Sequence, residues 1–92
     1  MRSIIQEHKE CYVCGRTEPL HLHHIFGGTA NRKKSDQYGL TMWLCPEHHT
    51  GPTGVHCNPE MMDCFHMMAQ KKFEKQIGDR DFFRHEFGRS YL

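Results

Sequence analysis

The sequence has no long apolar segment and no excess of charge of either sign. No run of residues approaches the roughly 18 apolar positions of a membrane span, and residues 1–10 lack the apolar centre of a secretory signal. The formal net charge is only +1, so composition alone neither favours nor excludes a nucleic-acid partner. We therefore expect a cytoplasmic protein that makes no membrane contact, and local motifs must indicate its partners.

The sequence also lacks the even set of cysteines that a full disulfide framework needs, because it has five. In a reducing cytosol, clustered cysteines more often bind metal than form disulfides. A chain of 92 residues buries proportionally little surface, so its core needs an additional cross-link. Five cysteines and nine histidines indicate that a metal provides it. There are no internal repeats and no low-complexity segments, and we expect one domain over residues 1–92.

Two short motifs supply four ligands for a structural zinc. The first is a C-x-x-C pair, Cys11 and Cys14, and the second is a C-x-x-H pair, Cys45 and His48. Zinc prefers a tetrahedron of sulfur and nitrogen ligands, which these four residues fill, and backbone amides in such a turn point at the thiolates. Metal binding would then contribute directly to folding. His49 is the main competitor of His48 for the fourth position.

Alternation of side chains predicts two strands. The first covers residues 20–25 and the second covers residues 39–44, with residues 26–39 as a long polar loop between them. In a regular strand, the neighbours His23 and His24 point to opposite faces, so one metal ion could not easily bind both. We expect one of them to bind an ion and the other to have a different role.

The last third of the chain predicts two helices. Asn58 and Pro59 are typical of a helix start, and Gly78 ends that helix. Asp79 caps a second, shorter helix that ends at Phe87. Apolar residues recur at three-to-four spacing on one face of the first helix: Met61, Phe65, Met68, Ala69, Phe73 and Ile77. Two strands followed by helices indicate the α+β class.

The motifs together resemble the HNH endonuclease family. In its zinc-supported members, a C-x-x-C pair precedes a strand with an Asp-His or His-His pair, and the returning strand ends in Leu-Cys-x-x-Cys-His. Here His48 takes the place of the last cysteine of that pattern. The similarity covers about residues 11–58 and is especially close to the phage recombination-enhancement (Ref-type) nucleases. It rests on two segments, His23-His24-Ile25-Phe26-Gly27-Gly28 and Leu44-Cys45-Pro46-Glu47-His48-His49.

This resemblance implies a small ββα-metal fold, also called the His-Me finger, with C-terminal helices. Its core would cover about residues 11–70, and a helical extension would cover about residues 71–92. The implied activity is metal-dependent hydrolysis of DNA phosphodiester bonds, with His24 as the general base. His23 and His49 would bind the catalytic metal, which we expect to be Mg²⁺, Mn²⁺, Ni²⁺ or Zn²⁺.

The third ligand of the catalytic metal does not follow directly from the resemblance. The family places it one helical turn after the position of His49, where this chain has Thr53, a poor ligand. We expect His56 to replace it, because a loop can bring this residue back to the site. His66 is the runner-up, and His21, on the same strand face as the metal-binding histidine, is a minor alternative.

The chain also departs from the family at the asparagine that orients the general base. No asparagine lies near residues 39–41, so either Asn31 or a backbone carbonyl would have to hold the ring of the base. The neighbouring basic residues Arg32, Lys33 and Lys34 would bind DNA phosphates together with Asn31, which gives affinity without sequence information.

Two other functions fit part of the sequence. The first is a zinc-binding module without catalysis, which recognises nucleic acid or protein through the basic segment. Such a module has no use for His23, His24 and His49 near one point. The second is a thiol redox protein, but the βαβ context of its C-x-x-C motif is missing. A recombination or phage-processing protein is a possible partner, and the sequence leaves the oligomeric state open.

Overall fold

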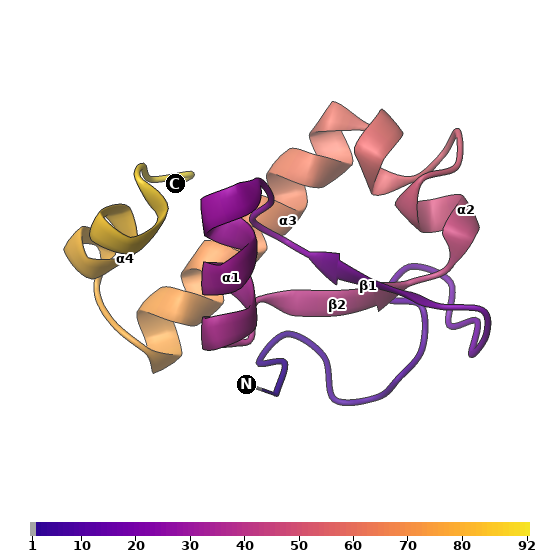
Figure 1. The fold of residues 1–92 in the computed structure, drawn as a ribbon, viewed down its shortest axis with the longest axis horizontal. Helices are drawn as coiled ribbons and strands as arrows, with labels where there is room; N and C mark the ends of the chain where they lie inside the picture. The colour runs from indigo at the N-terminus through magenta and orange to yellow at the C-terminus, as the bar shows by residue number, and fades with distance from the viewer. Residues whose placement is uncertain (1) are drawn as a thin grey trace.

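The computed structural model describes residues 2–92. Within that range, no helix is both long and apolar enough to cross a membrane. Helices α4 and α2 lie at opposite ends of the molecule, with the strands between them (Figure 1). The elements in chain order are β1 (His21–His24), α1 (Thr29–Tyr38), β2 (Thr41–Leu44), α2 (Pro46–His49), the 3₁₀ helix η1 (Val55–Cys57), α3 (Pro59–Gln76) and α4 (Arg80–Phe87).

The two strands form an antiparallel pair in which His21 lies opposite Leu44 and His24 opposite Thr41. Both strands lie inside the predicted ranges, and the α+β class is confirmed. The paired residues His23 and Met42 are 2% and 0% exposed, which identifies the inner face of the sheet. The ring of Phe65 from α3 lies 6.4 Å from the ring of His23 on this face.

The prediction of a long loop over residues 26–39 is wrong, because α1 occupies most of this segment. Its residues are almost all polar, so no apolar stripe marks them as a helix. Tertiary contacts hold α1 instead. Ser35 is fully buried; its hydroxyl accepts the N–H of Phe26 at 3.1 Å and donates to the carbonyl of Phe26 at 2.9 Å. Gly39 ends the helix with a φ of 71°, a conformation that favours glycine.

Helix α4 contacts α1 through one carboxylate, that of Glu86. Glu86 forms an ion pair with Lys34 at 3.0 Å and accepts a hydrogen bond from the Tyr38 hydroxyl. Burial, together with the hydrogen bond and the charge of Glu86, raises the pKa of Tyr38 to about 12. Lys34 and Tyr38 are four residues apart and therefore share one face of α1. This face of α1 therefore packs against α4.

The two predicted C-terminal helices are present with the expected caps. The Asn58 side chain accepts the N–H of Met61 at 3.1 Å, and the Asp79 side chain accepts the N–H of Phe82 at 2.9 Å. Helix α3 runs without a break past residue 70, where the resemblance puts the boundary between core and extension. Aromatic rings from the loop after β1 and from both helices pack together, among them Phe26, Phe73, Phe83 and Phe87.

The N-terminal segment covers the outer edge of β2 (Figure 1). Ile4 donates its N–H to the carbonyl of Gly39, the Ser3 hydroxyl donates to the carbonyl of Thr41, and Trp43 donates its N–H to the Gln6 side chain. These bonds satisfy backbone groups that a two-stranded sheet leaves open. They also fix the position of the segment that precedes the turn at Cys11.

Replacing Ser35 by alanine tests the docking of α1. The substitution leaves the N–H and carbonyl of Phe26 buried without their partner, so we expect the free energy of unfolding to fall by about 1–3 kcal/mol. Urea denaturation followed by circular dichroism measures this change. Gln37→Ala, at an exposed position of the same helix, is the matched control and should have little effect. Equal midpoints for the two variants would contradict the assigned role.

Candidate functional site

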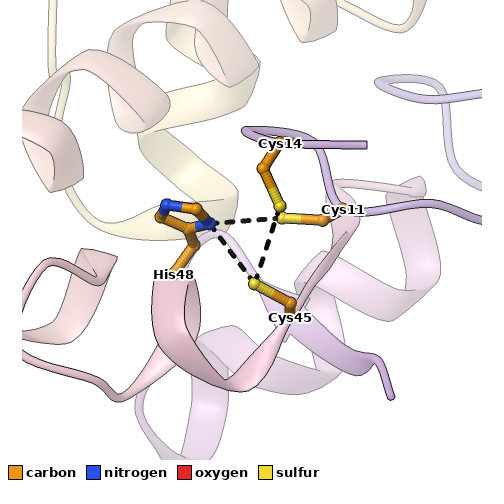
Figure 2. A group of neighbouring side chains, drawn as sticks. All are labelled: Cys11, Cys14, Cys45 and His48. Carbon is orange, nitrogen blue, oxygen red and sulfur yellow. Dashed lines mark hydrogen bonds between the residues drawn. The ribbon is translucent and has the colours of Figure 1, made fainter. Parts of the chain in front are cut away.

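Cys11, Cys14, Cys45 and His48 converge on one point from two parts of the chain (Figure 2). The first two cysteines lie in the turn that precedes β1, and Cys45 is the residue between β2 and α2. His48 projects from α2 with its Nδ1 toward the sulfurs. Nδ1 lies 3.3 Å from the Sγ of Cys45 and 3.7 Å from the Sγ of Cys11, while the Sγ atoms of Cys14 and Cys45 are 3.9 Å apart.

These distances fit a tetrahedral zinc site. With zinc–sulfur bonds of about 2.3 Å and zinc–nitrogen bonds of about 2.0 Å, tetrahedral edges are about 3.8 Å between two sulfurs and about 3.5 Å between sulfur and nitrogen. The observed separations lie close to both values. The Cys14–Cys45 distance also exceeds the roughly 2.05 Å of a disulfide, and all three cysteines are free thiols. The predicted Cys₃His cluster is therefore present and could hold a metal such as zinc.

The electrostatics of this cluster favour a bound cation. Burial works to raise the pKa of Cys11, but the backbone N–H groups of Cys45, Cys14 and Val13 and the ring of His48 lower it to about 6. The expected turn with amides directed at a thiolate is thus present. At Cys14, the N–H of Arg16 works to lower the pKa, yet slight burial and the sulfurs of Cys11 and Cys45 raise it above its ordinary value. A cation would relieve this repulsion between sulfurs.

A second cluster lies beside the first and consists of His23, His49 and His56. One ring nitrogen from each of the three lies within 4.8 Å of the other two. His23 comes from β1, His49 from the end of α2 and His56 from η1. The Nε2 atoms of His49 and His56 are 3.1 Å apart, close to the roughly 3.3 Å edge between two nitrogens of a tetrahedral zinc site. The three histidines expected at the second metal are therefore adjacent in space.

His23 has a feature that a bound ligand would explain. Among the residues that the structure describes, its Nε2 is the buried side-chain nitrogen or oxygen without a hydrogen-bond partner. Such an orphaned polar atom costs about 1–3 kcal/mol. Burial, and then the charges that His49 and His56 would carry, lower the pKa of His23 to about 3. The ring is neutral near pH 7 and can offer a lone pair.

The donor set of this second cluster also indicates which ions it fits. The pKa of His49 is lowered, first by burial and then by the charges that His56 and His21 would carry, so this ring favours its neutral form as well. Neutral imidazoles suit Ni²⁺ and Zn²⁺, whereas Mg²⁺ prefers carboxylate, carbonyl and water oxygens. Of the four ions expected from the sequence, Ni²⁺ and Zn²⁺ fit these ligands best.

His24 does not belong to the metal cluster but has a partner of its own. It is half-buried, and its Nε2 lies 2.9 Å from the Oδ1 of Asp36 on α1. The sequence predicts Asn31 or a backbone carbonyl as the group that holds this ring and does not indicate Asp36. No sequence pattern indicated Asp36, because a loop over residues 26–39 gives no reason to place residue 36 beside the first strand.

The structure separates the candidates for the third ligand. His66 lies outside the cluster: its ring stacks on Phe26 with centroids 5.0 Å apart, and its Nε2–H donates to the carbonyl of Ile25 at 2.9 Å. His56 is the candidate that joins His23 and His49. His21 also lies outside that group, with its Nδ1 3.0 Å from the Nδ1 of His49.

The second cluster opens into a hollow of about 250 Å³ that also contains His24 and one basic residue. Arg32 of α1 lines it, four residues and one helical turn before Asp36. Lys33 is exposed, whereas Lys34 is held by Glu86 on another face of α1. The lining residues are Leu22, His23, His24, Gly27, Arg32, His49 and His56.

Comparison with known proteins adds no relative. No protein-family model, no curated protein and no solved structure matches this chain. The assignment of function therefore depends on the geometry and chemistry of the two clusters.

If the Cys₃His cluster holds zinc, loss of the zinc should unfold the protein. Structural zinc contributes an apparent binding free energy of about 10–16 kcal/mol in small domains, as much as or more than the roughly 5–15 kcal/mol by which domains are stable. We expect Cys45→Ala to lose one equivalent of zinc and its cooperative thermal transition. Elemental analysis and circular dichroism measure the two effects. Cys64→Ala, at an exposed cysteine on α3, should retain both, and a stable zinc-free Cys45→Ala protein would contradict the prediction.

Proposed function

We propose that this protein is a metal-dependent endonuclease of the HNH type that hydrolyses phosphodiester bonds in DNA. One observation carries the proposal: His24, which contacts Asp36, lines the same hollow as the His23–His49–His56 cluster. A base and a metal site at one opening are the two parts that phosphodiester hydrolysis requires.

His24 acts as the general base in this proposal. With its Nε2–H donated to Asp36, the neutral ring keeps a lone pair on Nδ1 that can accept a proton from water. The water oxygen forms a bond to phosphorus while the bond from phosphorus to the 3′-oxygen breaks, which leaves a 5′-phosphate and a 3′-hydroxyl. Asp36 keeps the ring in one tautomer and stabilises its cation after the proton transfer, as the aspartate of a catalytic triad does.

His23, His49 and His56 supply the metal site. Their neutral rings fit a divalent ion, and the orphaned Nε2 of His23 would gain a partner. A divalent ion bound there would polarise the phosphoryl group and stabilise the negative charge on the leaving 3′-oxygen. The protein's near-neutral overall charge makes such local stabilisation important.

Arg32 positions the DNA. It is exposed, lies on the same face of α1 as Asp36 and lines the hollow, so its guanidinium can hold a backbone phosphate next to the scissile bond. Lys33 can contact a neighbouring phosphate, and Asn31 lies beside these residues on the same helix. Lys34 contributes less, because Glu86 neutralises it. Backbone contacts of this type confer affinity and register without base specificity.

The alternative is a zinc-binding module without catalysis. The Cys₃His cluster and the exposed basic residues of α1 fit this function equally well. It offers no reason for an unpaired nitrogen buried at His23, or for a carboxylate that holds His24 beside it. These two features favour the endonuclease.

Replacement of His24 tests the assigned base. We expect His24→Ala to lower the rate of plasmid nicking about 10²- to 10⁴-fold. Zinc content and thermal stability should stay near those of the wild type, because His24 lies outside both clusters. The assay uses supercoiled DNA with Mg²⁺, Mn²⁺, Ni²⁺ or Zn²⁺. The matched control is His85→Ala, at an exposed histidine on α4.

Equal nicking by His24→Ala and the wild type would remove the assigned base. A wild-type protein that binds DNA but nicks it with none of the four ions would instead support the non-catalytic module.

Replacement of Asp36 tests the orientation of the base. Asp36→Ala removes the acceptor of the His24 N–H, so we expect kcat to fall while KM and the metal affinity change little. Asp36→Asn keeps an oxygen at the same position and should recover part of the loss. Steady-state nicking rates and metal titrations measure these effects. A change confined to KM would indicate instead that Asp36 acts on DNA binding.

A further inference from the structure

His21, the first residue of β1, makes a direct contact with a residue of the second cluster. Its Nδ1 lies 3.0 Å from the Nδ1 of His49, and the two rings meet edge to face with centroids 5.1 Å apart. His21 is exposed and is not one of the three histidines whose nitrogens converge. The contact joins the strand to α2 on the side of His49 away from the cluster.

The two nitrogens must share one proton. A neutral imidazole has one N–H and one lone pair, so two neutral rings whose nitrogens lie at hydrogen-bond distance, with no metal ion between them, require one of each. Either His49 donates to His21, or His21 donates to His49. The distance by itself does not distinguish the two arrangements, because which nitrogen carries the proton is inferred from the surrounding network.

A metal bound by the second cluster would distinguish the two arrangements. The other ring nitrogen of His49, Nε2, faces the Nε2 of His56 at 3.1 Å. If His21 donated its proton, the neutral ring of His49 would carry its own proton on Nε2, directed into the cluster. That proton would block a metal from this nitrogen. If His49 donates through Nδ1, its Nε2 keeps the lone pair that a metal needs.

We propose that His21 is a positioning residue for the second metal site, where it accepts the Nδ1–H of His49 and thereby directs the Nε2 lone pair of His49 toward the ion. This inference rests on the metal site of the proposed function. His21 is not itself a ligand, because its Nδ1 faces the nitrogen of His49 that points away from the cluster. Hydrogen-bonded partners of metal-binding histidines commonly fix the tautomer and the direction of the ring in this way.

The position of His49 explains why such a partner is needed. His49 is the last residue of α2, a helix of four residues, and is only partly buried. A single turn of helix is not stable by itself, so it cannot fix the direction of a side chain at its end. The contact from β1 supplies a second point of attachment.

Three variants test the role of His21 without DNA. His21→Ala removes the acceptor. His21→Asn keeps one, because its side-chain oxygen is as many bonds from Cα as Nδ1 is. His8→Ala replaces an exposed histidine outside both clusters and is the control. Calorimetric titration with Ni²⁺, on protein whose Cys₃His cluster already holds zinc, gives the affinity of the second site.

We expect His21→Ala to weaken Ni²⁺ binding about 10- to 100-fold, the usual effect of losing such a partner. His21→Asn should restore most of the affinity, and His8→Ala should bind as the wild type does. Nitrogen-15 spectra of the histidine rings should show the proton of His49 on Nδ1 in the wild type. A wild-type affinity in His21→Ala, a His21→Asn protein as weak as His21→Ala, or a proton on Nε2 of His49 would each overturn the proposal.

Failure of this proposal can be told from failure of the proposed function. If the affinities follow the expected order but the protein cuts no DNA, the role of His21 stands and the endonuclease assignment fails. If cleavage requires metal but His21→Ala binds Ni²⁺ as the wild type does, the endonuclease assignment stands and the role of His21 is wrong.

Discussion

The one-turn helix α2 is the part on which both clusters depend. It presents His48 to the sulfurs of Cys11 and Cys45, while the next residue, His49, belongs to the histidine cluster. Successive side chains of an α-helix point about 100° apart, so two neighbouring residues can serve two sites. A helix this short needs an anchor, and the Cys₃His cluster provides one at Cys45 and His48. Metal bound there would order α2 and so place His49.

The chain that follows α2 packs closely against it. A Cβ atom at Gly51 would lie 2.6 Å from the carbonyl oxygen of Glu47, and one at Gly54 would lie 2.8 Å from the same atom. This close return of the backbone carries the chain from α2 to η1 and brings His56 back to His49. The loop that carries His56 is therefore part of the same unit as the Cys₃His cluster.

The buried polar groups of the core differ in whether they have hydrogen-bond partners. Ser35 and Gln70 are fully buried, and each has partners: Ser35 bonds the backbone of Phe26, and Gln70 bonds Glu74, Ser90 and the N–H of Tyr91. His23 is almost as deeply buried, yet its Nε2 lacks a partner in the described chain. Such an atom needs a physical explanation, and a metal ion bound by the histidine cluster would provide one.

The sequence alone determined the parts that depend on local geometry. The spacing of Cys11, Cys14, Cys45 and His48 indicated one cluster. Each pair lies in a short turn that brings its two ligands together, and zinc takes four such ligands. The alternation of side chains along the sequence indicated both strands. Asn58 and Asp79 indicated the helix starts, because a capping side chain bonds to backbone within three residues.

Only the tertiary structure decided the rest, because it concerns contacts between segments whose relative placement no local pattern encodes. Helix α1 is held by Ser35 and by Glu86 of α4, not by an apolar stripe of its own, so the loop prediction failed there. With that helix in place, Asp36 reaches His24 and Lys34 is drawn away to Glu86. The choice of His56 over His66, and the contact of His21 with His49, likewise depend on where the backbone returns after α2.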